Sequence, residues 1–288
     1  MRKYKLALSL AVICFFLLLF FGFLLFLQKS QPDADNSRLM TATLLKVGKA
    51  DAIIIQSGEN VIVIDAGEEE DGAEVQAFLA AQNISHIDTL IITHFDQDHV
   101  GGADTLVEQM DIGTVLLPAY HGTNTEYADF IQAMNRKSLT PQLLTEPFHF
   151  TLGKLDVLVE PPVSYEIPEG YLEYDNNFSL FVTVTYDENV LLFTGDAEKQ
   201  RIREWLENGT VSKCDFLKVP HHGIYTTALQ DLINATDPAY AGICTSKKHP
   251  ADSLTLELLK SSGVRTFQTK DGNIIVTSDG KRLDVWQT

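Results

Sequence analysis

The stretch that decides the fold is Leu90-Ile91-Ile92-Thr93-His94-Phe95-Asp96-Gln97-Asp98-His99-Val100-Gly101-Gly102. Its apolar start predicts a buried strand. Four side chains that can bind a metal follow within the six positions His94 to His99, which we call the hexad. A solvated turn with helix-capping carboxylates is the alternative. The density of ligand-type residues between a strand and a glycine pair favours a metal site. The reach of this loop suits two ions, with His94 and Asp96 facing one and Asp98 and His99 facing the other.

Two later segments repeat this design, in which metal-binding side chains follow an apolar strand. Leu191 to Asp196 ends in a carboxylate just past a glycine, where one oxygen can bind each of two cations. Leu217 to Gly223 contains the adjacent histidines His221 and His222. Taken alone, Asp196 would also serve as a helix N-cap, and a lone histidine is often a packing residue. Three ligand-bearing strand ends together predict one shared edge of the sheets.

The order of these motifs resembles that of the metallo-β-lactamase superfamily. The motifs are Asp65-Ala66-Gly67, His94-x-Asp96-x-Asp98-His99, Thr194-Gly195-Asp196 and His221-His222-Gly223. Within the superfamily, the chain resembles the extracellular hydrolase domain of ComEC-type competence proteins. That resemblance rests on the Asp at the third position of the hexad, on Asn176-Asn177-Phe178-Ser179-Leu180 and on His249-Pro250. It covers residues 41–286 and is much more specific for fold and metal binding than for substrate.

The resemblance implies two metal sites that share one carboxylate. The first would be held by His94, Asp96 and Asp196, and the second by Asp98, His99, Asp196 and either His221 or His222. The sequence does not choose between the two histidines, and the other one would contact substrate or move a proton. The implied catalytic residues are Asp98, which would orient a metal-bridging hydroxide, together with His221 and His249.

The first site departs from the pattern of related hydrolases, which often add a third histidine near Asn176-Asn177. Here that histidine is missing, and the only spare candidate, His149, is expected on a strand edge. Together with Asp96, this departure shifts the first site toward oxygen ligands. Oxygen ligands favour Mn²⁺ or Mg²⁺, while the imidazoles of the second site suit Zn²⁺. We therefore expect two divalent ions, Zn²⁺ or Mn²⁺.

A second departure lies in the opening turn, where the family usually has Gly-Gln-Gly-Asp-Ala. This chain has Gly48-Lys49-Ala50-Asp51-Ala52, which alters the chemistry of the loop and is expected to change substrate fit without touching metal binding. The expected substrate contacts are Lys218, Lys247, Lys248 and Asn177. Ordinary surface lysines are the alternative interpretation, because lysine is mostly exposed.

Residues 1–29 are expected to form a cytoplasmic basic flank and a transmembrane signal anchor. The stretch from Leu6 to Leu27 is uncharged and follows three basic residues. About 20 apolar residues span a bilayer as a helix, and the basic flank stays in the cytoplasm. A cleaved signal peptide is the alternative, but Phe26-Leu27-Gln28-Lys29 lacks a small-residue cleavage site. We expect a single-pass cell-membrane protein, with a linker at residues 30–38 and an extracellular hydrolase domain at residues 39–288.

The charge of this extracellular part limits its partners. Without residues 1–29 the chain keeps 18 basic and 39 acidic residues, a formal charge of −21. Such a surface repels polyanions over about a Debye length, which disfavours a stable nucleic-acid complex. Three cysteines are too few for a disulfide framework, and Cys214 and Cys244 are expected to be free thiols.

The apolar patterns predict an α/β fold, an αββα sandwich preceded by one transmembrane helix. A β-meander over residues 40–64 is followed by alternating strands and helices, with an irregular, rim-like region from 138 to 174 that holds a hairpin near Gly153. The leading hypothesis is a membrane-anchored, extracellular, dinuclear metal-dependent hydrolase of phosphodiesters, either nuclease-like or acting on the cell wall. One membrane segment does not make a DNA channel. The alternatives are hydrolysis of a lactam or ester, or a catalytically weak metal-binding sensor module.

Overall fold

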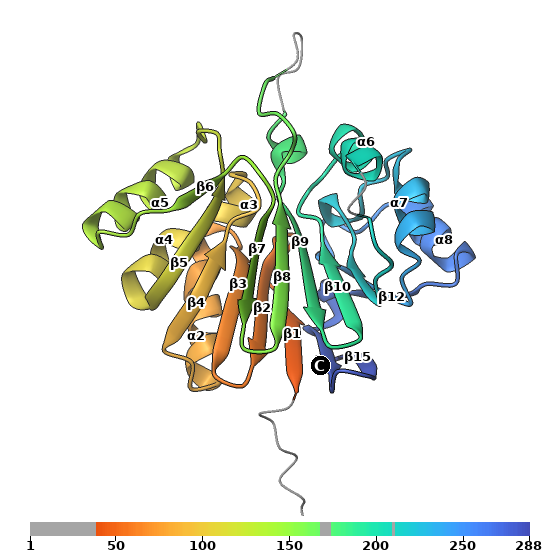
Figure 1. Ribbon diagram of the computed structural model, residues 1–288, viewed down its shortest axis with the longest axis horizontal. Helices are drawn as coiled ribbons and strands as arrows, with labels where there is room; N and C mark the ends of the chain where they lie inside the picture. The colour runs from red at the N-terminus through yellow and green to blue at the C-terminus, as the bar shows by residue number, and fades with distance from the viewer. Residues whose placement is uncertain (1–38, 168–173, 209–210) are drawn as a thin grey trace, which may run out of the picture. The chain divides into compact units, whose positions relative to one another are not determined.

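The computed structural model describes residues 39–167, 174–208 and 211–288 (Figure 1). The described residues all belong to one compact unit, Ser37–Thr288. The expected membrane anchor and linker, residues 1–38, lie outside the described residues. Within the described part, every helix is too short or too polar to cross a membrane.

The first sheet has eight strands in the order β15-β14-β1-β2-β3-β4-β5-β6. Its strands are β1 (Met40–Leu44), β2 (Ala52–Ser57), β3 (Asn60–Ala66), β4 (His86–Ile91), β5 (Asp111–Pro118), β6 (Gln142–Leu144), β14 (Ile274–Ser278) and β15 (Leu283–Gln287). The predicted meander is confirmed, because β1, β2 and β3 pair antiparallel. β4 then joins β3 in parallel, so the ends of both strands, with Asp65 and the hexad, reach the same edge.

The second sheet has seven strands in the order β13-β12-β11-β10-β9-β8-β7. Its strands are β7 (Phe148–Leu152), β8 (Leu155–Glu160), β9 (Phe181–Tyr186), β10 (Asn189–Phe193), β11 (Phe216–Lys218), β12 (Tyr240–Ile243) and β13 (Arg265–Gln268). β10, β11 and β12 run parallel, so Asp196 and the two histidines leave the sheet at one edge.

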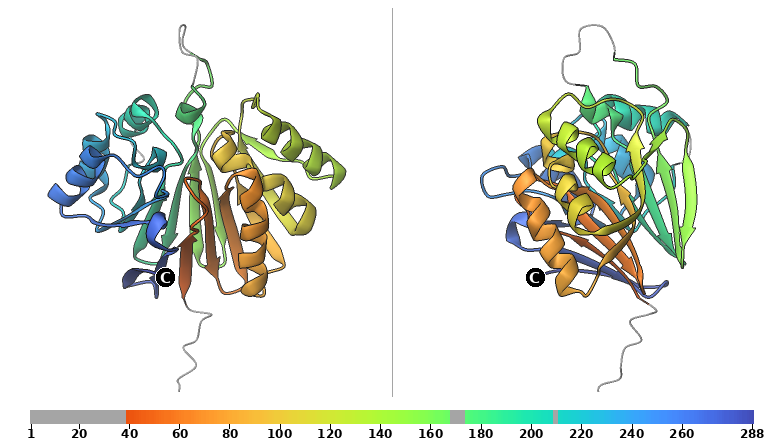
Figure 2. Two further views of the ribbon diagram at one scale, coloured as in Figure 1. Left: turned by 180° about the vertical axis from the view of Figure 1, so that it is seen from behind. Right: turned by 90° about the vertical axis from the view of Figure 1, so that its left-hand side faces the viewer.

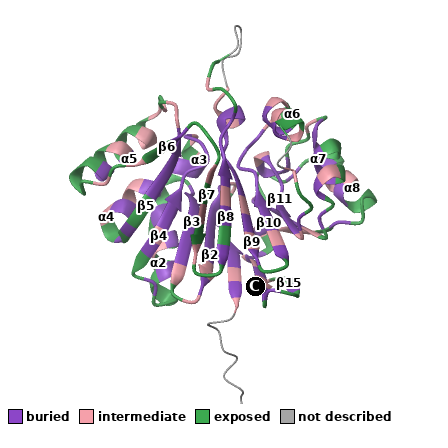
Figure 3. Ribbon diagram, viewed as in Figure 1, coloured by how far each residue is buried: buried purple, intermediate pink, exposed green. Residues whose placement is uncertain are grey.

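Helices cover the outer face of each sheet, as expected for an αββα sandwich. The helices are α2 (Gly72–Ala81), α3 (Gln97–Val100), α4 (Ala103–Gln109), α5 (Thr125–Arg136), α6 (Lys199–Asn208), α7 (Leu229–Thr236) and α8 (Ser253–Ser261). Figures 1 and 2 show α2, α4 and α5 on one side and α6, α7 and α8 on the other. Three apolar clusters form: one under each helix layer, and one between the sheets with Ile55, Val184 and Phe193. Figure 3 shows the buried strands between helices whose outer faces are exposed.

The region from residue 138 to 174 differs from the expected rim. The hairpin at Gly153 is present, with a positive φ of 59° that glycine tolerates. However, its second strand lies inside the sheet, and Leu155, Val157 and Val159 are buried between the two sheets. These buried residues alternate with the more exposed Asp156 and Leu158, the two-residue repeat of a strand that has one face in the core. The strand β13 was also not predicted.

Two smaller expectations are confirmed. His149 lies on the edge strand β7, where its exposed ring pairs with Asp156 of β8. Cys214 and Cys244 are free and buried. Burial raises the pKa of the Cys214 thiol to about 12, so this thiol is unreactive in the folded chain.

Candidate metal centre

The hexad bends so that its ligand-type side chains face the shared edge from two directions. His94 follows the end of β4, while Asp96 is the extended residue before the short helix α3, which contains Asp98 and His99. Both histidines are buried, whereas the side chain of Asp96 is 42% exposed. The hexad therefore reaches from the protein interior to the surface.

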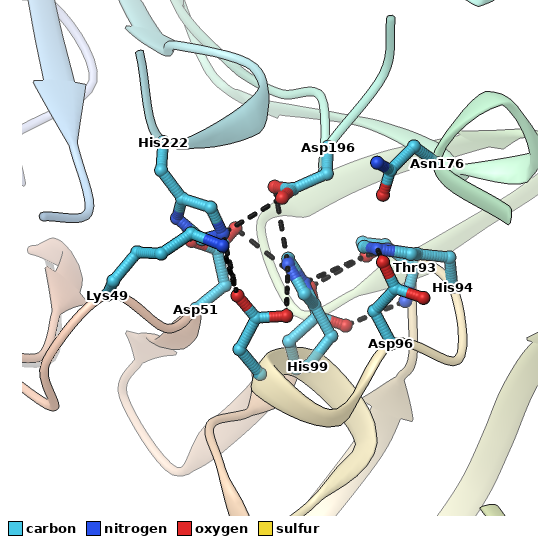
Figure 4. A network of polar contacts seen from close by, with 12 residues as sticks. Lys49, Asp51, Thr93, His94, Asp96, His99, Asn176, Asp196 and His222 are labelled. Atoms are coloured by element: carbon cyan, nitrogen blue, oxygen red, sulfur yellow. Dashed lines mark hydrogen bonds and ion pairs between the residues drawn. The ribbon is translucent and has the colours of Figure 1, made fainter. Parts of the chain in front are cut away.

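Four buried side chains from distant segments meet in one cluster, which we call the His/Asp cluster: Asp51, His99, Asp196 and His222. Their ligand atoms all lie within 4.8 Å of one another. Asp196 is central, with Oδ1 3.2 Å from His99 Nε2 and Oδ2 2.8 Å from His222 Nε2. Figure 4 shows these four side chains converging. Separate carboxylate oxygens thus face the two imidazoles predicted for the second metal site. His94 and Asp96, predicted for the first site, are not members of this cluster.

The outer hydrogen bonds fix which ring nitrogen of His99 and His94 faces the cluster. Asp65 accepts from His99 Nδ1 at 2.8 Å and from Thr93 Oγ1 at 2.7 Å. Since the Thr93 hydroxyl donates its proton to Asp65, its oxygen accepts from His94 Nδ1, at 3.1 Å. In both rings Nδ1 carries the hydrogen, and Nε2 faces the site. A partner that holds Nδ1 in this way is typical of metal-binding histidines.

His222 follows the same rule with a different partner. Its Nδ1 donates to the Cys244 carbonyl oxygen at 3.1 Å, because a carbonyl can only accept. Within the described residues, Nε2 of His94, His99 and His222 is buried without a hydrogen-bond partner. The carboxylates around these nitrogens cannot donate, so each Nε2 requires either a proton or a cation. The donor set fits divalent metal ions.

The pKa shifts of the His/Asp cluster also indicate that positive charge is favoured there. Burial alone would lower the pKa of His99 and His222, but Asp196 outweighs burial and raises both. Burial alone would raise the pKa of Asp196 and Asp98, but the neighbouring histidines hold both below the usual range. Protons therefore occupy positions that a metal ion would take over.

Three residues at this site have an unusual backbone conformation. Asp65, His221 and His222 have positive φ values of 59°, 48° and 51°, a region that residues other than glycine rarely adopt. Such strain persists only where the surroundings enforce it, and it is frequent at functional sites. The consecutive left-handed residues send the two histidine rings in different directions.

The structure thereby distinguishes the two histidines that the sequence left open. His222 Nε2 lies 2.8 Å from Asp196 and 3.2 Å from Asp98 Oδ2. The His221 ring turns away, with Nδ1 3.6 Å from Glu198 Oε1. His222 is therefore the better candidate ligand, and His221 stays a predicted substrate or proton-transfer residue beside it.

Lys218 is not placed as a substrate contact. Its side chain is 0% exposed, with Nζ 2.5 Å from Asp51 Oδ2, 2.8 Å from the Gly195 carbonyl and 3.3 Å from Asp196 Oδ1. As a residue of β11, it points inward under the His/Asp cluster. An exposed lysine was expected at this position, but three buried oxygens hold the Lys218 ammonium inside the protein.

Asn177 is also directed away from the expected substrate. Its Oδ1 accepts from the backbone N–H of Arg201 at 3.1 Å, near the start of α6, and its Nδ2 donates to Glu198. Lys247 is exposed. Lys248 and His249, by contrast, line a cleft of about 1190 Å³ that also includes Asp96, Asp98 and His222.

Three residues of this centre were not predicted as site residues from the sequence: Asp51, Asp65 and Asn176. All three lie in motifs that were noted in the sequence, and Lys49 lies in the opening turn that was expected to change substrate fit. Lys49 lines the cleft, and its Nζ lies 2.9 Å from Asp98 Oδ2. The available signal was the position of these polar residues: Asp51 follows β1, Asp65 lies at the end of β3, and Asn176 lies in η3 (Asp175–Phe178), just before β9.

The model of the Metallo-beta-lactamase superfamily matches residues 45–246. ComE operon protein 3 of Bacillus subtilis is 27% identical over 201 residues, which cover 69% of this chain and 25% of that protein. Recombination protein 2 of Haemophilus influenzae is 27% identical over 239 residues, covering 81% and 27%. The chain thus spans about a quarter of the length of these relatives.

Among solved structures, the metallo-beta-lactamase fold protein YhfI from Bacillus subtilis superimposes with a TM-score of 0.54. The two share 11% sequence identity, and the match covers 83% of this chain and 100% of YhfI. At this identity the likeness concerns the fold alone.

Proposed function

This chain belongs to the metallo-beta-lactamase superfamily, and we propose that it is a dinuclear metal-dependent hydrolase of phosphodiesters. The observation that carries the proposal is the set of three buried histidine Nε2 atoms that face carboxylates and have no hydrogen-bond partner within the described residues. The superfamily and the buried His/Asp cluster support metal-dependent hydrolysis. The choice of phosphodiesters rests on the cleft.

Two groups of residues would hold the two ions, and Asp196 is the proposed shared ligand. His99, His222 and Asp98 would hold one ion, and His94 with Asp96 would hold the other. When bound, the ions supply acidity to a water molecule and positive charge to the substrate's oxygens. Asp98 lies at the cleft wall within 3.2 Å of His222 Nε2 and would accept the proton that the attacking water loses. His221 and His249 would then return a proton to the leaving alcohol.

The cleft offers cationic groups beside this centre. Lys49 and Lys248 line it together with His249. Ammonium groups bind the non-bridging oxygens of a phosphodiester, which supports an anionic substrate. The cleft also contains Glu68, Glu126 and Asp175, and the chain as a whole is strongly acidic. We infer that short phosphodiesters, including those of the cell wall, are better substrates than long nucleic acids, which this charge repels.

We also propose that the domain is held on the outer face of the cell membrane. The support is the uncharged stretch Leu6–Leu27 behind a basic flank. Membrane fractionation, followed by protease treatment of intact cells, tests the proposal. Degradation of the domain in intact cells agrees with it, and full protection contradicts it.

Activity is tested with the full-length protein in detergent, stripped of metal and reloaded with Zn²⁺ or Mn²⁺. We expect turnover of bis(p-nitrophenyl) phosphate, and loss of that turnover in Asp98→Ala. Lys247→Gln serves as a control that should keep activity. Absence of turnover with either metal would contradict the proposal.

Two alternatives predict other results in the same assay. A lactam hydrolase would cleave nitrocefin, although Asp96 replaces a histidine that zinc β-lactamases usually have there. A sensor module would bind metal without turning over either substrate. The carboxylates Asp96, Asp98 and Asp196 would bind metal in either case, so turnover separates the hydrolase from the sensor module.

A further inference from the structure

We propose that Asn176 supplies a neutral oxygen ligand to the metal ion held by His94 and Asp96. This inference rests on the proposed dinuclear site and adds a residue to it. Asn176 belongs to the short 3₁₀ helix η3, on a segment distant in sequence from the hexad.

The orientation of the Asn176 amide follows from its neighbour Glu198. Asn176 Nδ2 lies 3.4 Å from Glu198 Oε1, and an ionised carboxylate can only accept hydrogen bonds. The NH₂ group must therefore face Glu198, because a flipped amide would set oxygen against oxygen. This fixes Oδ1 on the opposite side of the amide, where it is buried without a hydrogen-bond partner within the described residues.

The adjacent asparagine shows that this free oxygen is specific to one position. Asn177 Nδ2 lies 3.5 Å from the other oxygen of Glu198, so both amides share one carboxylate. Asn177 Oδ1, however, accepts from the Arg201 backbone N–H at 3.1 Å. Of the two, only Asn176 keeps an acceptor for another partner.

The other two residues proposed for this ion also present hydrogen-bond acceptors. Figure 4 shows Asn176 on the side of the network where His94 and Asp96 lie. His94 Nε2 lies 3.5 Å from Asp96 Oδ2 and also has no hydrogen-bond partner within the described residues. A phosphodiester oxygen carries no proton and cannot satisfy an amide oxygen. A cation satisfies all three acceptors at once.

This ligand set has consequences for metal choice. A carboxamide oxygen is harder than imidazole nitrogen, so the site would accept Mn²⁺ more readily than a site with a second histidine. It also adds no charge, which leaves more of the positive charge of the ion for the substrate.

The test is calorimetric titration of the metal-free, full-length protein with Mn²⁺ and, separately, with Zn²⁺. We expect two sites in the unchanged protein. Asn176→Ala should weaken one of them at least tenfold and leave the other unchanged. Asn176→Asp should keep the Mn²⁺ affinity, because a carboxylate oxygen replaces the amide oxygen, and Asn176→His should shift preference from Mn²⁺ toward Zn²⁺. The exposed Asn234→Ala is the matched control.

Each other outcome overturns the inference. If Asn176→Ala leaves both affinities unchanged, the amide oxygen is not a ligand. If it weakens both sites equally or lowers the melting temperature of the metal-free protein, its role is structural. A single site in the unchanged protein also contradicts it, whereas no metal binding at all contradicts the proposed function itself. A water molecule in place of direct ligation would leave Asn176→His without a shift in metal preference.

Discussion

The Lys218 ammonium lies 2.5 Å from Asp51 Oδ2, and both side chains are buried beneath the His/Asp cluster. The same ammonium is 3.3 Å from Asp196 Oδ1. Burial alone would lower the pKa of Lys218, but Asp51 and Asp196 raise it above the usual range, so this lysine stays charged. Lys218 therefore holds two carboxylates of the centre in place before any metal arrives.

Replacing Lys218 with Met should lower the free energy of unfolding by about 3–5 kcal/mol, because Asp51 is left buried without its counter-charge. Urea denaturation of the metal-free protein measures the loss. Combining Lys218→Met with Asp51→Asn should recover part of it. A single variant as stable as the unchanged protein would contradict the buried ion pair.

His222 and His221 should differ in their effect on metal binding. His222→Ala removes the ring whose Nε2 faces Asp196, so metal affinity should fall by more than about 100-fold, since even outer-shell changes cost 10–100-fold. His221→Ala should keep affinity within about threefold, because that ring faces Glu198, outside the His/Asp cluster. Elemental analysis after dialysis against a set free-metal concentration compares the two. Equal losses would show that both rings are ligands.

Metal affinity should increase as the pH rises above the ordinary histidine range. Asp196 raises the pKa of His99 and His222, so both rings hold protons at pH values where free histidine is neutral. A metal ion must displace these protons, and the apparent Kd should fall about tenfold per pH unit for each proton displaced. Titrations from pH 6 to 9 measure the slope. An apparent Kd that does not change with pH would contradict the presence of protons on His99 and His222.

The same shifts predict the opposite trend for the stability of the metal-free protein. A histidine whose folded-state pKa is raised stabilises the fold at low pH and loses this contribution as the pH rises through the folded pKa. The melting temperature of the metal-free protein should therefore fall from pH 6.5 upward. Bound metal should remove this fall, because it replaces the protons. A rise over this range without metal would contradict the shifts.

Lys49 should contribute to binding of an anionic substrate. Lys49→Gln removes an ammonium from the cleft wall and should raise the KM for bis(p-nitrophenyl) phosphate about tenfold, in line with the loss of one hydrogen bond to a charged group. The kcat should change less, because Asp98 keeps His222 as a partner. Lys247→Gln is the control, since Lys247 is exposed and outside the cleft lining. An equal increase in KM in both variants would show that the overall surface charge, rather than Lys49 in the cleft, determines substrate binding.

Much of the fold follows from local sequence pattern. The apolar runs of the meander predicted over residues 40–64 become β2 and β3. Both strands can be predicted because the order and composition of their own residues are enough to indicate a buried strand. The strand β8 was missed as part of the core because its short alternating stretch lies between prolines and turns. Its place in the sheet depends on pairing with β9, a partner that follows it at some distance in the chain.

For the centre, the sequence by itself determined which residues stand at strand ends: the hexad, Asp196 and the histidine pair. Within each sheet, parallel strands carry such residues to one edge, and the packing of the two sheets then brings the two edges together. Only the tertiary structure decided which way each side chain points. Left-handed backbone sends His222 inward and His221 aside, three buried oxygens draw Lys218 under the His/Asp cluster, and Arg201 engages Asn177 while leaving the oxygen of Asn176 free. These choices depend on groups that are distant in sequence, because a buried polar atom turns to whichever partner the packed fold brings within reach.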